Sequence, residues 1–331
     1  MLNLTTFYLR WYMGKKISMK HILAFLIFEV FFVSITMPAL VFYGPFTNIR
    51  NTFVTTAMTT FTHQYLATLF LPKNVINKIM SMNKIQTGKT DKNLINFTNK
   101  HDKSIEVYNI YGKHFEGKMI LIHDPTRVQV GISSKFPKEG ETTSVIAKNY
   151  DAIAAINAGG FGDSSMKGIG GAPQGFVIQN GKVLYTEIKN PNEKVDLIGF
   201  TQDGKLLVGN YRYKDILEMS IKEAVSFGPA LVINGQPMIK RGDGGWGIAP
   251  RTAIGQRRDG TVIFLVIDGR SLKSIGATLK DVQDIMLKYG AYNAANLDGG
   301  SSTTMYFKGK VINNPSDALG ERCVPTIFFA K

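Results

Sequence analysis

An almost unbroken run of apolar residues occupies positions 22 to 43, near the start of the chain. Its 22 residues contain one charged side chain, Glu29, and one helix breaker, Pro38. At about 1.5 Å per residue, a helix of this length can cross the hydrocarbon core of a bilayer. The run is longer than a signal-peptide core, and no clear small-residue cleavage site follows it. We therefore predict an uncleaved transmembrane signal anchor over residues 22–43.

The charges that flank the apolar run predict its orientation. Residues 1–21 carry Arg10, Lys15, Lys16 and Lys20, whereas Arg50 is the single base just after the run. Positive charge collects on the cytoplasmic side of membrane helices. We expect a single-pass protein of the cell membrane, with residues 1–21 in the cytoplasm and everything after residue 43 extracellular.

The next two segments predict a connection between the anchor and a folded domain. Within residues 44–82, apolar side chains recur at helical spacing from Phe53 to Phe70, with threonines on much of the other face. This pattern indicates a juxtamembrane amphipathic helix, which either lies on the membrane or packs against the following domain. Residues 83–104 are rich in Lys, Asn and Thr and predict a polar linker with no buried positions.

From Ile105 onward the apolar positions alternate, as they do in half-buried strands. Tight-turn pairs separate several of these runs and predict hairpins: Asn180-Gly181, Asp203-Gly204, Asp259-Gly260 and Lys308-Gly309. Helical patterns cover Thr143–Tyr150, Tyr213–Val225 and Leu279–Tyr289, the last with Thr278 as its cap. Strands in runs with inserted helices predict an α+β domain over 105–331, with a mixed, largely antiparallel sheet and a few packed helices.

Composition narrows the classes of partner and chemistry. The chain has one cysteine, so an intrachain disulfide and a cysteine-based zinc site are excluded. Its formal charge of +14 suits an anionic envelope or a phosphate-bearing substrate. Basic clusters interleaved with aromatic residues are missing, so we expect no nucleic-acid partner.

Four polar clusters follow or begin predicted strands, and together they indicate a site. They are residues 157–161, 250–253, 268–270 and 296–304. Strand ends hold side chains rigidly, as a preorganised site requires. Arginine can bind phosphate oxygens, and glycine turns expose N–H groups. A carboxylate can stabilise an oxocarbenium-like centre or act as a nucleophile or base. All five histidines precede these clusters or lie outside them, which disfavours a Ser-His-Asp hydrolase.

The combination of motifs from about Phe115 to Ala330 resembles the phosphodiester glycosidase family, whose bacterial members include proteins of exopolysaccharide biosynthesis. The matching motifs are Asn157-Ala-Gly-Gly-Phe161, Gly228-Pro-Ala-Leu-Val232 with Asn234-Gly235, Pro250-Arg-Thr-Ala-Ile-Gly255, Val266-Ile-Asp-Gly-Arg270, Asn296-Leu-Asp-Gly-Gly300 with Ser302-Thr303, and Glu321-Arg322. One departure is visible, because Ser301 stands where many members have a third glycine.

The resemblance implies hydrolysis of a sugar-1-phosphodiester at the sugar's C1–O bond, with no cofactor. We expect Asp298 to carry the chemistry, Arg251 to bind the phosphate, and Asp268 to support them through an ion pair with Arg270 or Arg251. The remaining expected site residues bind substrate: Asn157, Gly159, Gly160, Thr252, Arg270, Asn296, Gly299, Gly300, Ser301, Ser302 and Thr303. The predicted partner is a carbohydrate phosphodiester or envelope glycopolymer, reached from a membrane anchor.

Two other functions fit part of the pattern. A membrane-anchored glycan-binding protein of exopolysaccharide assembly would need no positioned acid, whereas this chain has both Arg251 and Asp298. A phosphodiesterase that cuts the P–O bond would normally use metal ligands, and no metal-binding motif is evident. The sequence therefore favours a glycosidase.

Overall fold

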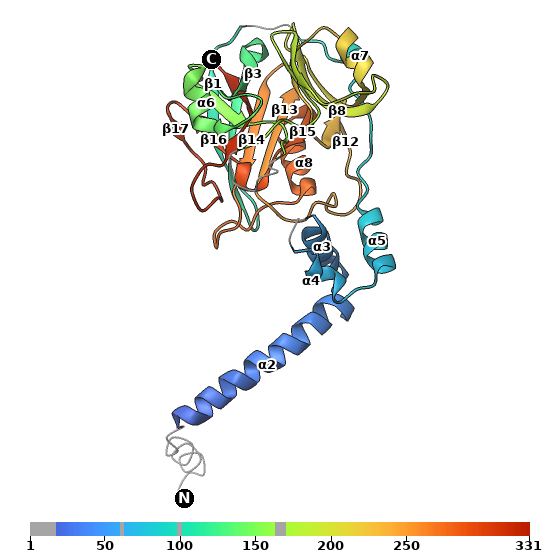
Figure 1. Cartoon of the computed structure of the whole chain (residues 1–331), viewed down its shortest axis with the longest axis vertical. Coiled ribbons are helices and arrows are strands. Elements are labelled where there is room, and N and C mark those ends of the chain that lie inside the picture. The colour runs from blue at the N-terminus through green and yellow to red at the C-terminus, as the bar shows by residue number, and fades with distance from the viewer. Residues whose placement is uncertain (1–17, 60–62, 98–100, 163–169) are drawn as a thin grey trace, which may run out of the picture.

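Helix α2 (Met19–Tyr43) projects from the rest of the molecule as a single rod (Figure 1). The computed structural model describes residues 18–59, 63–97, 101–162 and 170–331. In this part of the chain α2 is the one helix long and apolar enough to cross a membrane. Phe42 is its only buried residue, so nearly all of its apolar surface needs another environment. Residues 1–17, which belong to the segment predicted to be cytoplasmic, lie outside the described residues.

Three short helices follow α2 and bury their apolar faces against one another. They are α3 (Thr47–Met58), α4 (Tyr65–Thr68) and α5 (Lys73–Met82). Val54, Ala57, Ala67 and Ile79 form a small core that also includes Phe42. The prediction of one amphipathic helix from Phe53 to Phe70 is wrong, since α3 ends at Met58 and α4 begins at Tyr65.

Helix α3 also contacts the large domain, as the second interpretation of this segment required. The Thr55 hydroxyl donates to Asp243 Oδ2 at 2.7 Å, and the Ile248 backbone N–H donates to Thr56 Oγ1 at 3.1 Å. Both contacts fall on the loop 242–248. The helical segment therefore rests directly on a loop of the domain that it connects to α2.

Residues 83–97 are part of the domain, so the prediction of a linker without buried positions is wrong there. Thr90 exchanges backbone and hydroxyl hydrogen bonds with Val208, each 3.0 Å long, and accepts from the Tyr211 hydroxyl at 2.9 Å. Ile95 is 4% exposed and joins the core. The sequence pattern misses this packing because isolated residues and backbone bonds carry it, without any apolar period.

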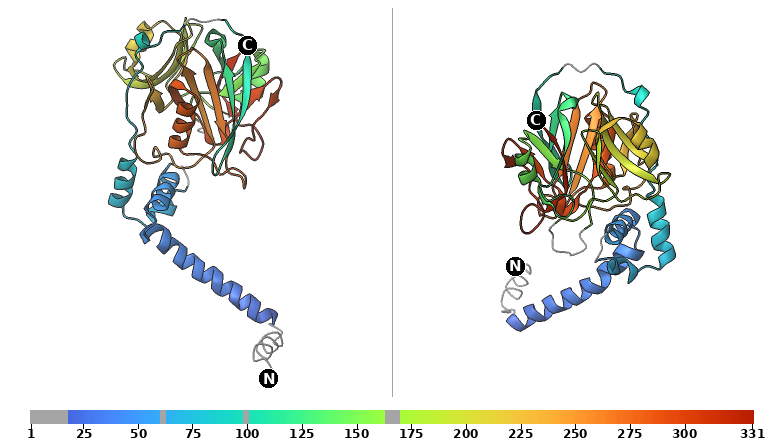
Figure 2. Two further views of the ribbon diagram at one scale, coloured as in Figure 1. Left: turned by 180° about the vertical axis from the view of Figure 1, so that it is seen from behind. Right: turned by 45° about the horizontal axis from the view of Figure 1, so that its top comes forward.

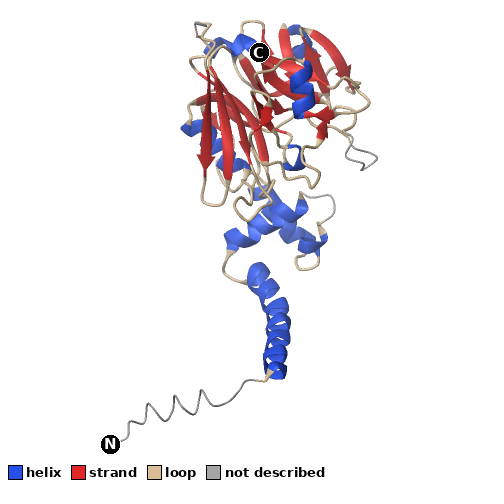
Figure 3. Cartoon of the chain, turned by 90° about the vertical axis from the view of Figure 1, so that its left-hand side faces the viewer, coloured by secondary structure: helices blue, strands red, loops and turns tan. Residues whose placement is uncertain are grey.

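The domain contains three larger antiparallel sheets (Figure 3). In spatial order, the seven-stranded sheet contains β1 (Ile105–Tyr111), β2 (Glu116–Ile122), β14 (Val262–Ile267), β13 (Arg251–Arg257), β15 (Ala291–Leu297), β11 (Ala230–Ile233) and β12 (Gln236–Pro237). A five-stranded sheet contains β7 (Lys182–Thr186), β6 (Phe176–Gln179), β10 (Ile221–Val225), β8 (Lys194–Thr201) and β9 (Leu206–Arg212).

The third sheet contains β17 (Lys310–Val311), β16 (Met305–Phe307), β5 (Ala154–Asn157), β19 (Thr326–Ala330) and β3 (Val128–Ile132). β18 (Cys323–Val324) and β4 (Glu141–Thr142) form a small fourth sheet. The remaining elements are helices: η1 (Lys92–Leu94), η2 (Pro125–Arg127), α6 (Thr143–Asn149), α7 (Tyr213–Glu218), α8 (Leu279–Lys288) and η3 (Gly300–Ser302).

The three sheets share one apolar core, which fixes their mutual positions (Figure 2). Phe264 from the first sheet, Ile198 from the second and Phe328 from the third belong to the same buried cluster. Val282 and Met286 of α8 pack against the other face of the seven-stranded sheet. The expected α+β fold with largely antiparallel strands is confirmed.

The local predictions hold where turn or cap chemistry is explicit. All four turn pairs join neighbouring antiparallel strands. Helix α8 begins at the predicted cap, Thr278, with a complete capping box. The helix expected over Tyr213–Val225 is half wrong: α7 ends at Glu218, Ser220 adopts a φ of +52°, and the following residues form the buried strand β10.

Candidate active site

Asp268 and Asp298 directly follow β14 and β15, which end on the same side of the seven-stranded sheet. We call this row of strand ends the site edge. β13 begins there at Arg251, which pairs with Ile267 on β14, and its Thr252 pairs with Leu297 on β15. Asp268 and Asp298 directly follow these two partners. Because β13 lies between them, their backbones are separated by two strand spacings, roughly 10 Å. The structure thus brings together the clusters at 250–253, 268–270 and 296–304.

Asn157, at the end of β5, attaches the third sheet to this edge. Its side-chain Nδ2 donates to the Asp298 backbone carbonyl at 2.6 Å. Its Oδ1 accepts from the Thr252 hydroxyl at 2.8 Å and from the Thr304 backbone N–H at 3.1 Å. The Asp298 backbone N–H donates to Ala158 at 3.0 Å. Both polar atoms of the buried Asn157 side chain are engaged by protein groups, which favours a role in positioning Asp298 over contact with a substrate.

Burial raises the pKa of Asp298 to about 6. Its side chain lies deep among protein atoms, although the residue keeps some access to solvent. The Ser302 hydroxyl, the charge of Arg322 and the Gly299 backbone N–H lower the pKa of Asp298, but together they do not offset the desolvation. The site therefore holds a carboxyl group that changes protonation state near neutral pH.

A group of polar atoms beside Asp298 has no hydrogen-bond partner among the described residues. These buried atoms are Asn296 Oδ1, Ser302 Oγ, Thr303 Oγ1 and Thr304 Oγ1. Ser302 is close enough to influence the pKa of Asp298 but falls short of hydrogen-bond geometry. Buried polar groups are normally paired, so such a cluster is well suited to a ligand rich in hydroxyls.

The two glycines after Asp298 shape the turn that carries these hydroxyls. A Cβ on Gly299 would lie 2.8 Å from the Pro250 carbonyl oxygen. Gly300 adopts a φ of +61° and donates its N–H to that carbonyl at 2.9 Å. Their absent side chains thus permit a close approach between the turn and the start of β13.

Asp268 is tied to a different loop from the one expected. Its Oδ1 accepts from the Asn313 side chain and from the Asn314 backbone N–H, both at 3.0 Å. Arg270 instead donates to Ser301 Oγ at 2.8 Å. The expected ion pair between Asp268 and Arg270 or Arg251 is wrong, because each side chain has other partners. Burial raises the pKa of Asp268, and the two hydrogen bonds from residues 313 and 314 counteract this effect.

Arg251 is directed into the protein. Its Nε donates to the Ala277 carbonyl at 3.0 Å, and its Nη2 donates to the carbonyls of Trp246 at 2.9 Å and Gly247 at 2.7 Å. The residue is 4% exposed, and burial lowers the pKa of its guanidinium to about 10. This geometry favours a role in holding the loop 246–247 over the direct phosphate contact that the sequence predicted.

The glycines of the 157–161 cluster serve packing. Gly159 donates its N–H to the Thr326 hydroxyl at 3.1 Å. A Cβ on Gly160 would lie 2.7 Å from the Phe227 ring and 2.8 Å from Gln174 Oε1. Phe227 in turn meets the Trp246 ring edge-on, with ring centroids 6.1 Å apart. The cluster therefore brings an aromatic pair close to the strand ends.

Arg322 was absent from the site residues expected from the sequence. Its charge acts on Asp298, and its guanidinium lies 5.0 Å from the centre of the Phe161 ring. The neighbouring Glu321 accepts hydrogen bonds from Ser144. The Glu321-Arg322 motif was the available signal, but a pair of charges on a predicted loop gives no indication of what it faces.

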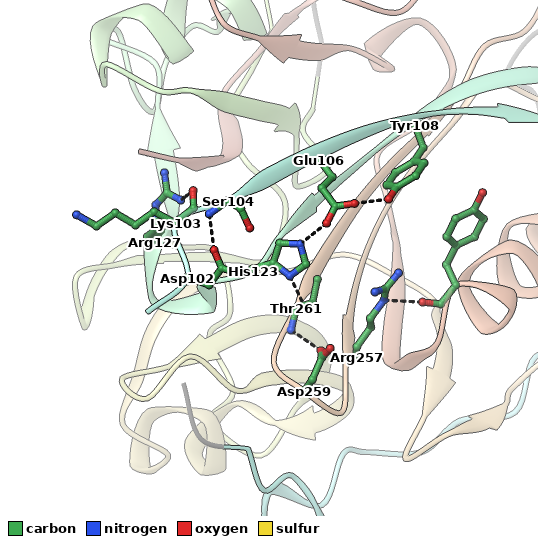
Figure 4. A network of polar contacts seen from close by, with 11 residues as sticks. Asp102, Lys103, Ser104, Glu106, Tyr108, His123, Arg127, Arg257, Asp259 and Thr261 are labelled. Carbon is green, nitrogen blue, oxygen red and sulfur yellow. Dashed lines mark hydrogen bonds and ion pairs between the residues drawn. The ribbon is translucent and has the colours of Figure 1, made fainter. Parts of the chain in front are cut away.

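His123 lies at the opposite end of β2 from the strand ends that carry Asp268 and Asp298. A ring nitrogen of His123 lies 2.7 Å from the Glu106 carboxylate. Figure 4 shows His123 between Glu106 and Thr261. His123 follows one end of β2, whereas Asp268 pairs with Glu116 at the other end. His114 lies closer to the site, because its backbone carbonyl accepts from the Ile275 N–H in the loop after Asp268. No cluster of three or more His, Cys, Asp or Glu residues suited to a metal occurs in the described part of the chain.

The fold is an α+β fold with a buried carboxyl group at the strand ends of its largest sheet. The sequence profile of the phosphodiester glycosidase family matches residues 150–331, more than half of the chain, so the chain belongs to that family.

Comparisons with individual proteins agree with this assignment. The chain is 32% identical over 212 residues to the SPbeta prophage-derived uncharacterized protein YomE of Bacillus subtilis, covering 62% of this chain and 31% of that protein. It is 39% identical over 70 residues to the N-acetylglucosamine-1-phosphodiester alpha-N-acetylglucosaminidase of Bos taurus, covering 21% of this chain and 13% of that protein. It thus spans about a third or less of these relatives.

The zebrafish N-acetylglucosamine-1-phosphodiester alpha-N-acetylglucosaminidase catalytic domain, solved in a form auto-inhibited by its pro-peptide, shares the fold. The two structures superpose with a TM-score of 0.60 at 24% identity, over 74% of this chain and 88% of that chain.

Proposed function

We propose that this protein is a membrane-anchored hydrolase that cleaves a sugar-1-phosphodiester at the sugar's C1–O bond, with Asp298 as its catalytic carboxylate. The observation that carries the proposal is the environment of Asp298. Asn157 holds its backbone, burial raises its pKa to about 6, and a cluster of buried hydroxyls lies beside it. Family membership supplies the reaction class.

The proposed chemistry places a water oxygen on C1 and breaks the bond from C1 to the phosphate oxygen. The phosphate leaves as a stable anion, so it needs little help from a general acid. The Asp298 carboxylate either takes a proton from the attacking water or bonds to C1 and is then released by water. Both routes return a free sugar and a phosphomonoester, and the configuration of the released sugar distinguishes them.

Two arginines can bind the phosphate. Arg322 already lies close enough to lower the pKa of Asp298, and Arg270 contacts Ser301 in the turn that follows Asp298. The fork of a guanidinium matches phosphate oxygens. Asn296, Ser302 and Thr303 then bind sugar hydroxyls. Arg251 and Thr252 act indirectly, because their side chains hold the loop 246–247 and Asn157.

The membrane anchor and the substrate context are also parts of the proposal. Helix α2 can span a bilayer, and the basic residues before it favour a cytoplasmic N-terminus and an extracellular domain. An envelope glycopolymer or an exopolysaccharide precursor is then within reach. Protease added to intact cells should remove the domain, and full protection of a folded domain would contradict this topology.

Hydrolysis in oxygen-18 water tests the reaction. The full chain should be screened against a panel of sugar-1-phosphodiesters, with Asp298→Asn and Arg322→Ala as variants. C1–O cleavage puts the label on the sugar, whereas label in the phosphate would indicate P–O cleavage and overturn the proposal. Binding of these compounds without turnover by the wild-type protein would favour the alternative, a glycan-binding protein.

A further inference from the structure

The candidate active site lies at the end of the domain that is joined to the membrane helix. Helix α3 begins four residues after α2 ends and contacts Asp243 and Ile248. The same loop is held by Arg251, where β13 begins at the site edge. Figure 1 and Figure 3 both place the segment α3–α5 between α2 and this end of the domain. The site is thus close to the membrane surface from which α2 would emerge.

The most exposed large apolar side chains of the domain surround the same end. Among the described residues after 104, Leu272 and Leu319 are essentially fully exposed, at 106% and 96%, and Tyr111 follows at 72%. Their loops converge on the site edge. Ser274 donates to the Asp268 carbonyl at 2.6 Å, and Ser316 donates to the Gly300 carbonyl at 3.4 Å.

Tyr111 is the last residue of β1, and it pairs with Glu116, whose carbonyl accepts from the Asp268 N–H. Three separate loops therefore present their apolar tips around one edge. We call Tyr111, Leu272 and Leu319 the tip residues. A single exposed leucine needs no explanation, but three apolar tips at the end of the domain joined to α2 form a candidate surface for contact with the bilayer.

Basic side chains accompany the tip residues. Lys113 and Lys273 are exposed next to Tyr111 and Leu272, and Lys240 and Arg241 are exposed in the segment leading to the loop on which α3 rests. Glu116 is exposed in the same region, and Asp317 is half-buried with its carboxylate accepting from the Leu319 N–H. Among the exposed charged side chains of these loops, bases therefore outnumber acids. Each base near an anionic bilayer strengthens binding roughly fivefold.

We propose that the tip residues enter the bilayer surface beside α2, and that the substrate is a glycosyl phosphodiester whose second ester partner is a long-chain lipid alcohol. This proposal rests on the proposed function and names its substrate class. With the tips in the bilayer, the site faces the depth at which a lipid-linked phosphate lies. Water then adds to C1, the C1–O bond breaks, the sugar leaves with a free hydroxyl, and the lipid phosphate stays in the membrane.

Lipid contact can be measured without any activity. In the full chain carrying Cys323→Ser, Leu272→Cys and Leu319→Cys are labelled one at a time with an environment-sensitive dye. The protein is placed in vesicles with about one third anionic lipid, with and without lipids that carry a quencher near the headgroup. Leu217→Cys, on α7 at the opposite end of the domain in Figure 1 and 51% exposed, is the matched control.

We expect quenching at positions 272 and 319 and none at 217. Quenching at none of the three positions, or equally at all three, overturns the docking surface. This result is independent of the proposed function, because it requires no substrate.

The substrate class is tested with two esters of the same sugar-1-phosphate, one of methanol and one of a long-chain alcohol in the vesicles. Replacing both leucines (Leu272→Asp with Leu319→Asp) should lower kcat/KM for the lipid ester by about tenfold or more and change it less than twofold for the methyl ester. Leu217→Asp should change neither.

Equal losses on both esters would mean that the leucines support the fold, and equal wild-type rates on both esters would mean that the lipid is irrelevant. Either result overturns the lipid-linked substrate and leaves the glycosidase standing. Hydrolysis of neither ester by the wild type would instead contradict the proposed function, with the quenching result still valid for the surface.

Discussion

Replacing Asp298 with asparagine should stabilise the fold at neutral pH while removing activity. Asparagine has nearly the same shape but carries no charge, so it avoids the desolvation that raises the pKa of Asp298 to about 6. A group that destabilises the folded state is expected where function demands it. The two effects of one substitution therefore separate a catalytic carboxylate from an aspartate that caps a turn.

The magnitude follows from the pKa shift. The pKa of Asp298 rises from 3.8 to about 6, and each pKa unit corresponds to about 1.36 kcal/mol. The ionised Asp298 side chain then lowers the free energy of unfolding at pH 7 by at most about 3 kcal/mol. Because the folded protein holds the proton more tightly, the wild type is relatively most stable below pH 3.8 and loses this stability as the pH rises to about 6. In the asparagine variant, position 298 does not titrate.

Thermal unfolding of the full chain in detergent, at pH 4 and pH 7, measures this difference. We expect the Asp298→Asn variant to melt several degrees above the wild type at pH 7, since about 1 kcal/mol shifts Tm by roughly 2–4 °C in a domain of this size. At pH 4 the two should nearly coincide. Its kcat should fall by about three orders of magnitude. A free energy of unfolding lowered by about 1 kcal/mol at both pH values, with kcat unchanged, would identify Asp298 as a turn cap and would refute the reasoning.

Three further predictions concern residues around the site and the domain boundary. Arg251→Lys should lower the free energy of unfolding by about 2–4 kcal/mol, because lysine cannot reach three carbonyls at once, and unchanged denaturant unfolding would contradict this. Asp268→Ala should lower kcat/KM and the free energy of unfolding together, because it removes the oxygen that accepts from Asn313 and Asn314; a loss of rate alone would return Asp268 to direct catalysis. A chain beginning at Lys84 should unfold cooperatively, whereas one beginning at Ile105 should be less stable because it lacks Thr90 and Ile95; equal midpoints would show that this segment contributes nothing.

The sequence predicted those parts of the fold in which a local residue type has a single structural use. The four turn pairs and the Thr278 cap are of this kind, since turn and cap geometry depends on the residues themselves. The second half of the 213–225 segment shows the limit. Its residues have no strong local preference, and the five-stranded sheet takes them as β10 because that buries Ile221 and Val225.

The candidate site was predicted as a set of clusters, but the direction of each side chain was not. The sequence placed Arg251 and Asp298 at strand ends, which the register of β13 against β15 confirms. Whether an arginine points outward or inward depends on backbone carbonyls that arrive from elsewhere, here those of residues 246, 247 and 277. The same is true of Asn157, whose three partners come from three separate segments.

The pH dependence of the reaction should reveal in which protonation state Asp298 acts. A glycosidase that expels an alcohol needs a protonated carboxyl to donate to the leaving oxygen, so its rate falls as that group ionises. A phosphate leaves as an anion without a proton, and the carboxylate must then be ionised to accept a proton from water or to bond to C1. The kcat/KM for a sugar-1-phosphodiester should therefore rise with pH through about 6, the pKa of Asp298, and then level off. Arg322→Ala removes a positive charge that lowers this pKa and should move the midpoint upward. A rate that falls across the same range would assign Asp298 the role of an acid, and a midpoint unmoved by Arg322→Ala would show that the titrating group lies elsewhere.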